Sequence, residues 1–168
     1  MPETRPTRTR WIILAILFMI TTNNYLDRII LGILSPVILE DLQLSKMHYG
    51  YINSAFQFTY AIGFLIMGKV IDRQGTRIGY SISIFLWSVA AGLHALSRSA
   101  VSLGFWRAML GLGESGNFPA AIKAVSEWLP KKDRAFATGI FNAGTNVANM
   151  IGQPLVVWMN CHFGWRHR

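Results

Sequence analysis

Residues 78 to 96 read IGYSISIFLWSVAAGLHAL, and this stretch decides the fold class because it contains no Asp, Glu, Lys or Arg. A helix needs roughly 20 such apolar residues to cross the hydrocarbon core of a bilayer, which is about 30 Å thick. Only Ser97-Arg98-Ser99 separates this run from the next one, which begins at Ala100. Helices joined by so short a connection are antiparallel neighbours. The sequence therefore predicts an all-α protein that crosses a membrane several times.

Apolar runs of the same kind fill most of the chain on both sides of this pair. The first run is interrupted by polar residues at 23, 24, 27 and 28 before it resumes. We predict a basic cytoplasmic segment at 1–10 and a transmembrane domain at 11–168, whose last residues look like the lead-in to a sixth span. The five predicted spans lie at about residues 11–39, 49–67, 78–96, 100–125 and 136–159.

The composition excludes a water-soluble domain. Of 168 residues, 52% are apolar and 14% are charged, whereas soluble domains carry about 25% charged residues. The net charge of +8 would suit nucleic acid or an acidic membrane surface, so the positions of the cations have to decide between them. The single cysteine, Cys161, cannot form an internal disulfide bond or a thiolate metal site. We expect no metal site.

The cations indicate which side of the membrane each connection faces. With the N-terminus inside, ten Lys and Arg lie in inner segments and four in outer segments. This bias predicts a cytoplasmic N-terminus. The basic residues are dispersed among short connections and form no continuous stripe, which excludes nucleic acid as a partner. The inner cations are Arg5, Arg8, Arg10, Lys69, Arg73, Arg77, Lys123, Lys131, Lys132 and Arg134.

Two glycine motifs resemble nucleotide-binding loops, and we reject both. Residues 63–69 read Gly-x-x-x-x-Gly-Lys, but Val70 stands where Ser or Thr should coordinate magnesium. Residues 111–116 read Gly-x-Gly-x-x-Gly within a predicted span, and no strand pattern precedes them. Glycines this dense in a membrane helix let neighbouring helices approach closely or loosen the helix near a site. We therefore predict no enzyme and no nucleotide cofactor.

Four charged residues lie well inside the predicted spans, away from their ends, where a charge at mid-bilayer costs about 2.5 to 3.5 kcal/mol on insertion scales. Asp27 and Arg28 lie in the first span, and Arg107 and Glu114 lie in the fourth. Arg107 and Glu114 are seven residues apart, or about 700° around a helix, so they share one face. We expect the four groups to face one another or a water-filled cavity. A static Asp27–Arg28 pair that fixes helix packing is the alternative.

Uncharged polar side chains also recur at helical spacing. Asn24 and Tyr25 lie four and three residues before Arg28, and Gln57 and Tyr60 form a similar stripe in the second span. A further set at 142, 146, 149 and 153 fits hydrogen bonding between helices as well as it fits a binding site. Ordinary packing or surface roles are expected for His48, His94, His162 and His167.

The loop after the second predicted span resembles the signature loop of the major facilitator superfamily. Residues 68–77 read GKVIDRQGTR, against Gly-x-x-x-Asp-Arg-x-Gly-x-Arg in that family, and occupy the same place on the inner side between spans two and three. Three further stretches are similar to its anion:cation symporters, and most similar to hexuronate transporters. They are NYLDR at 24–28, the run from Arg107 to Lys123, and EWLPKKDR at 127–134.

The resemblance implies a fold and a set of roles. The fold would be five helices of the six-helix N-terminal half of a transporter. Arg28 and Arg107 would bind the substrate carboxylate and hydroxyls, because a guanidinium offers a fixed fork of donors. Asp27 and Glu114 would carry protons, so that proton and substrate occupancy are coupled. The other implied substrate-site residues are Tyr25, Tyr60, Asn24 and Gln57.

The signature loop would act as an inner gate. Asp72 would latch it by pairing with a nearby arginine or by lying at a helix N-terminus, and would release as the gate opens. The implied gate residues are Gly68, Asp72, Arg73, Gly75, Arg77 and Arg134, with Arg73, Arg77 and Arg134 as the partners of Asp72.

The implied function is proton-coupled symport of hexuronates or related sugar acids, by alternating access, in the bacterial inner membrane. Its partners would be a small organic anion, the lipid bilayer and a C-terminal half, with H⁺ as coupling ion and no other cofactor. We expect the five spans not to transport alone. Two alternatives remain open: a non-transporting membrane subunit or regulator, and a truncated remnant. A third, a soluble enzyme that uses the glycine-rich segment, would require release of the protein in water without detergent.

Overall fold

The computed structural model describes residues 7–94 and 96–163, with side chains except at 7, 31 and 159–163. Every regular element in these ranges is a helix, which confirms the predicted all-α class. The elements are α1 (Thr7–Asp41), α2 (Lys46–Gln74), α3 (Thr76–His94), α4 (Ala100–Glu114), α5 (Asn117–Trp128), the short 3-10 helix η1 (Lys131–Asp133) and α6 (Arg134–Phe163).

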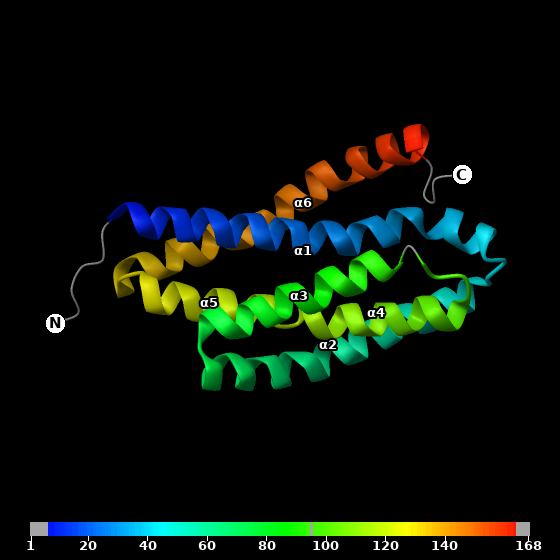
Figure 1. The fold of residues 1–168 in the computed structure, drawn as a ribbon. Coiled ribbons are helices and arrows are strands. Elements are labelled where there is room, and N and C mark those ends of the chain that lie inside the picture. Colours follow the sequence, from blue (N-terminus) through cyan, green and yellow to red (C-terminus); the bar gives the residue numbers. More distant parts are fainter. Residues whose placement is uncertain (1–6, 95, 164–168) are drawn as a thin grey trace.

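The helices run lengthwise beside one another (Figure 1). The closest pairs are α1 with α6, α2 with α4, and α3 with α4. The α1–α2 and α3–α4 connections lie at one end of the bundle, and the α2–α3 and α5–α6 connections lie at the other. Gly75 alone joins α2 to α3, and its φ of 85° is a conformation that only glycine adopts without strain. By length and composition, α1 from Arg8 and α2 could each cross a bilayer.

The fourth predicted span, 100–125, differs from the structure because it is broken in the middle. The helix α4 ends at Glu114, and α5 begins at Asn117. Glycine is a poor helix former, and Pro119 has no N–H to donate to the carbonyl of Ser115. At the same place, the Ser115 hydroxyl donates a hydrogen bond to the Leu112 carbonyl of α4 at 2.6 Å. The passage therefore consists of two short helices joined by Ser115-Gly116.

Glycines on α4 bring its backbone against both neighbouring helices. A Cβ built on Gly111 would lie 2.6 Å from the carbonyl oxygen of Phe56 in α2. A Cβ on Gly113 would lie 2.6 Å from the backbone nitrogen of Trp87 in α3. No larger side chain fits either position without a backbone shift. Gly111 and Gly113 thus allow the close helix packing that the sequence predicted.

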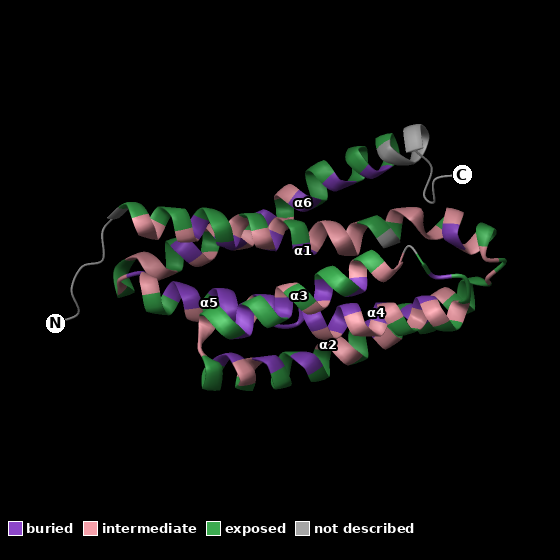
Figure 2. Ribbon diagram, viewed as in Figure 1, coloured by how far each residue is buried: buried purple, intermediate pink, exposed green. Residues whose placement is uncertain are grey.

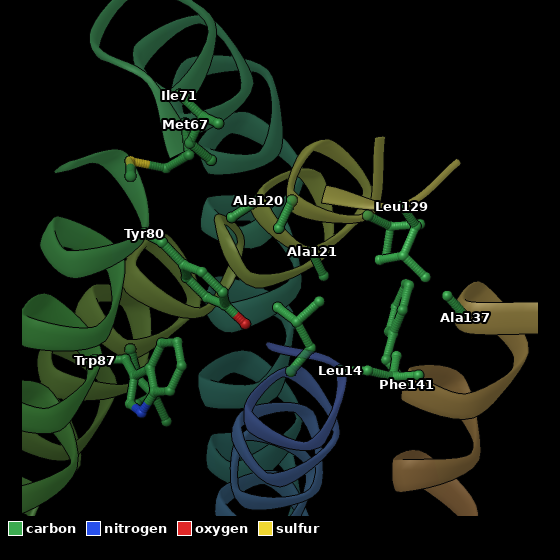
Figure 3. Close-up of a cluster of buried hydrophobic side chains, with 14 of the residues drawn as sticks. Leu14, Met67, Ile71, Tyr80, Trp87, Ala120, Ala121, Leu129, Ala137 and Phe141 are labelled. Carbon is green, nitrogen blue, oxygen red and sulfur yellow. The ribbon is translucent and has the colours of Figure 1, made fainter. Parts of the chain in front are cut away.

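The main apolar core lies where α5 meets the other helices. Figure 3 shows Leu14 from α1, Met67 and Ile71 from α2, Tyr80 and Trp87 from α3, and Phe141 from α6, around the alanines of α5. The Tyr80 hydroxyl donates to Asn117 Oδ1 at 2.6 Å and so ties the start of α5 to α3.

Large apolar side chains also cover the outside of the bundle. Much of α1, α2 and α6 is exposed, whereas buried residues are concentrated on α4 and α5 (Figure 2). An outward-facing apolar surface is stable against lipid and not against water. The exposed apolar residues include Met19, Phe58, Leu65, Phe85, Val101 and Met150.

The close approach of α4 to α3 makes Gly113→Ala destabilising. The added methyl group collides with the Trp87 backbone, and overpacking of this kind costs about 1–3 kcal/mol. The melting temperature of the detergent-solubilised chain should fall. Gly104→Ala is the matched control on the same helix, because its Cβ would meet only Ile52 Cγ1, at 3.6 Å. Equal melting temperatures for the two variants would contradict the packing.

Candidate functional site

The charged residues of the predicted spans lie on two helices around the middle of the bundle. Asp27 and Arg28 lie on α1, and Arg107 and Glu114 lie on α4. Their surroundings are apolar helices, so each charge must be balanced locally. The structure joins the two helices through a direct ion pair.

Arg28 and Glu114 form this pair. The Nε atom of Arg28 donates to Oε2 of Glu114 at 2.6 Å. The Glu114 side chain is fully buried, and the Arg28 side chain is 23% exposed. A charge-assisted hydrogen bond this short is among the strong ones. The pair therefore fixes the guanidinium of α1 against the end of α4.

Aromatic rings surround the Arg28 guanidinium. Its Cζ lies 4.5 Å from the ring centre of Tyr60, 5.0 Å from that of Tyr25 and 5.4 Å from that of Phe56. Cations within about 6 Å of a ring centre are attracted to the ring face. Arg28 is thus oriented by three rings as well as by one carboxylate.

Arg107 contacts the same phenylalanine. Its Cζ is 4.3 Å from the centre of the Phe56 ring, and the residue is only 4% exposed. Phe56 therefore lies beside both guanidiniums. Sequence reasoning missed it, although it precedes Tyr60 by four residues and so shares that face of α2.

Several buried polar atoms near these residues have no hydrogen-bond partner in the part of the chain that the structure describes. They are Nε of Arg107, Oε1 of Glu114 and Nδ2 of Asn24. Buried polar groups are nearly always hydrogen-bonded, to protein, to water or to a ligand. Both donors and an acceptor are therefore available to a bound molecule.

A cavity of about 100 Å³ adjoins this group. Asp27, His94 and Arg107 supply its polar lining, and Ile30, Ala91 and Leu110 supply the apolar part. The structure thus brings Arg28, Tyr25, Tyr60 and Glu114 together, with Arg107 beside them and Asp27 on the cavity.

Two other predicted polar positions, Gln57 on α2 and Asn149 on α6, make no hydrogen bond to the charged group in the part of the chain that the structure describes. Gln57 is exposed on α2, next to the buried Phe56, and its role stays a prediction. On α6, Asn149 Nδ2 donates to the Thr145 carbonyl of its own helix at 3.0 Å. Hydrogen bonding of Asn149 is therefore within α6 and not between helices.

The signature loop has a different partner from the expected arginines. Lys123 Nζ, on α5, lies 3.3 Å from Asp72 Oδ1 and donates to the Ile71 carbonyl at 2.8 Å. Arg134 donates instead to the carbonyls of Leu129 and Ser126, at 3.1 and 2.7 Å. The expected Asp72–Arg134 contact is therefore absent here, because α5 and not α6 lies over the end of α2.

The remaining gate residues surround this contact. Arg73 and Arg77 are exposed at the end of α2 and the start of α3. Gly75 makes the turn between them, and Gly68 has open space around its Cα. Lys123 is the residue that sequence reasoning did not assign to the gate, although it ends one of the stretches on which the resemblance rests.

Breaking the Arg28–Glu114 pair on one side should destabilise the fold more than removing both partners. Glu114→Leu or Arg28→Met leaves a buried charge without its partner, which costs about 3–5 kcal/mol. The double variant should regain most of the lost melting temperature. Arg98→Met, at an exposed position, serves as the control. A double variant that melts as low as the sum of the single effects would contradict a direct pair.

Lys123 should matter to stability through Ile71 more than through Asp72. Asp72 is 78% exposed, and an exposed ion pair contributes about 0–1 kcal/mol. The hydrogen bond to a backbone carbonyl from a charged donor contributes about 1.5–3 kcal/mol. Lys123→Met should therefore lower the melting temperature clearly more than Asp72→Asn. The reverse order would show that the ion pair dominates.

Comparison with known proteins gives close relatives. Residues 16–167 match the Major Facilitator Superfamily. The hexuronate transporter of Escherichia coli (strain K12) is 37% identical over 157 residues, which are 94% of this chain and 36% of that protein. A probable galactarate/D-glucarate transporter of the same strain, GarP, is 36% identical over 165 residues, 95% of this chain and 37% of that one. The galacturonate transporter of Dickeya chrysanthemi is 34% identical over 157 residues, 94% of this chain and 46% of that one.

A solved structure of a transporter has a similar fold. A bacterial homologue of the human lysosomal transporter Spinster, in an inward-facing and occupied conformation, superposes with a TM-score of 0.85 at 27% identity. The match covers 96% of this chain and 35% of that one. This chain thus spans between about a third and a half of the length of its curated relatives. Because the family match extends over nearly all of the sequence, the chain belongs to the Major Facilitator Superfamily.

Proposed function

We propose that this chain serves proton-coupled symport of organic anions, with hexuronates or related sugar acids as substrates. The observation that carries the proposal is the pair of guanidiniums, Arg28 and Arg107, that both lie beside Phe56 within an apolar bundle. Two cations held this close are costly in lipid and are suited to an anion. A binding role explains why both are present.

The chemistry of the guanidinium favours a carboxylate. Its planar fork of donors matches the two oxygens of a carboxylate, which gives two parallel hydrogen bonds. Arg107 Nε is buried and has no partner among the described residues. The hydroxyls of a sugar acid would bind the remaining polar groups, which are Asn24, Tyr25 and Tyr60.

Charge balance supplies the coupling. Asp27 and Glu114, when ionised, offset the two arginines, so the group is neutral without a ligand. When one carboxyl accepts a proton, one positive charge is left over, and a substrate carboxylate then restores neutrality. Proton and anion therefore favour each other's binding, which is the thermodynamic requirement for symport.

The relatives support the substrate class. Three of them carry names that refer to hexuronate, galactarate or D-glucarate, and galacturonate. All of these are sugar acids with at least one carboxylate and several hydroxyls. The arginines, the tyrosines and the asparagine suit that combination of groups.

Alternating access would supply the movement. In transporters of this kind the substrate lies near the midplane between two halves, and this chain would supply one wall of that site. The count of inner cations favours a cytoplasmic N-terminus in a bacterial inner membrane. The α2–α3 loop would then face the cytoplasm, where the contact of Asp72 with Lys123 would change as the inner side opens.

Uptake measurements test the proposal. The complete gene that contains this coding sequence is expressed in cells without hexuronate uptake of their own, and entry of labelled glucuronate is followed. Arg107→Lys should lower uptake about 10- to 100-fold, since it removes about 1.5–3 kcal/mol of charged hydrogen bonding. Arg98→Lys, in the exposed α3–α4 connection, should not change uptake. Full uptake by Arg107→Lys would contradict anion binding at this site.

A further inference from the structure

His94 occupies a place that packing alone does not explain. It is the last residue of α3, at the end of the bundle that holds the α1–α2 and α3–α4 connections (Figure 1). Its Nδ1 lies 2.7 Å from the carbonyl oxygen of Ala90. Because a carbonyl oxygen only accepts, Nδ1 carries the hydrogen. In the neutral ring, Nε2 is then a free acceptor.

The Nε2 atom is buried and has no hydrogen-bond partner among the residues that the structure describes. A buried polar atom without a partner is destabilising. His94 also lines the 100 Å³ cavity together with Asp27 and Arg107. His94 therefore lines the same pocket as Asp27, the carboxylate to which the proposed function assigns a proton.

We infer that His94 is a proton relay between the outer end of the bundle and Asp27. This inference rests on the proposed symport. A hydronium ion at the outer end gives its proton to the Nε2 lone pair, which leaves a water molecule and an imidazolium. The proton then passes through cavity water to the Asp27 carboxylate, and Nε2 regains its lone pair. A pocket of about 100 Å³ is large enough to hold water.

The charges around the cavity favour passing a proton on from His94 over holding it on the ring. Arg107 from α4 and Asp27 from α1 line the pocket together with His94. The helices α2 and α5 also pack on α3, and none of the described residues that line the cavity comes from them. A positive ring beside Arg107 is repelled, whereas the Asp27 carboxylate attracts the proton. His94 thus acts on the route to Asp27 and is not the site where the proton stays.

The test separates proton movement from substrate movement in membrane vesicles that contain the complete gene product. Counterflow of glucuronate without a pH gradient needs binding and alternation but no net proton flux. Accumulation driven by an imposed pH gradient needs the proton as well. His94→Gln keeps a hydrogen-bonding side chain of similar reach but cannot carry a proton. His48→Gln is the matched control, because His48 is exposed at the same end of the bundle.

The expected result is counterflow within twofold of wild type for His94→Gln, together with at least a tenfold loss of gradient-driven accumulation. His48→Gln should keep both activities. Wild-type accumulation by His94→Gln would overturn the relay.

A second variant covers the case in which His94→Gln does not fold. His94→Asn keeps a donor for the Ala90 carbonyl but has no atom in the place of Nε2, and the same outcomes apply to it. Loss of counterflow in both variants would show that the ring serves packing, and would also overturn the relay. Absence of sugar-acid counterflow in the wild type would instead contradict the proposed function itself.

Discussion

A guanidinium inside an apolar helix bundle has to keep a negative charge beside it, and the Arg28–Glu114 pair meets this constraint. The pair connects the middle of α1 to the end of α4, at 2.6 Å. Phe56, on α2, lies beside both Arg28 and Arg107. Three helices thus meet around two cations whose orientation is already set by rings and by a carboxylate. An incoming anion would find its binding groups in place and would pay little to order them.

Glu114 reaches this position because of the residues on either side of it. Gly111 and Gly113 allow the α4 backbone to lie against α2 and α3, and the helix ends directly after Glu114. The break also directs α5 over the end of α2, where Lys123 contacts the loop that holds Asp72. One glycine-rich segment therefore positions both the charged group and the inner loop. Fold and candidate site depend on the same few residues.

Hydrophobic runs and helical spacing predict the all-α bundle and the shared face of Arg107 and Glu114, because both depend on local periodicity alone. The break after Glu114 has local signals, Gly116 and Pro119, but similar residues also occur in unbroken membrane helices. Lys123 replaces the expected arginines at Asp72 because its place depends on how α5 lies against α2. His94 gives no signal at all in the sequence, since a lone histidine looks the same whether it packs or lines a cavity. Tertiary packing decides the surroundings of both Lys123 and His94.

The central claim is that a proton on one of the buried carboxyls leaves a guanidinium free to bind an anion. Calorimetric titration of the purified gene product with glucuronate, in two buffers of different ionisation enthalpy, counts the protons that are taken up on binding. The account predicts an uptake that approaches about one proton per anion as the pH rises and both carboxyls become ionised beforehand. Anion binding without proton uptake at any pH would contradict it.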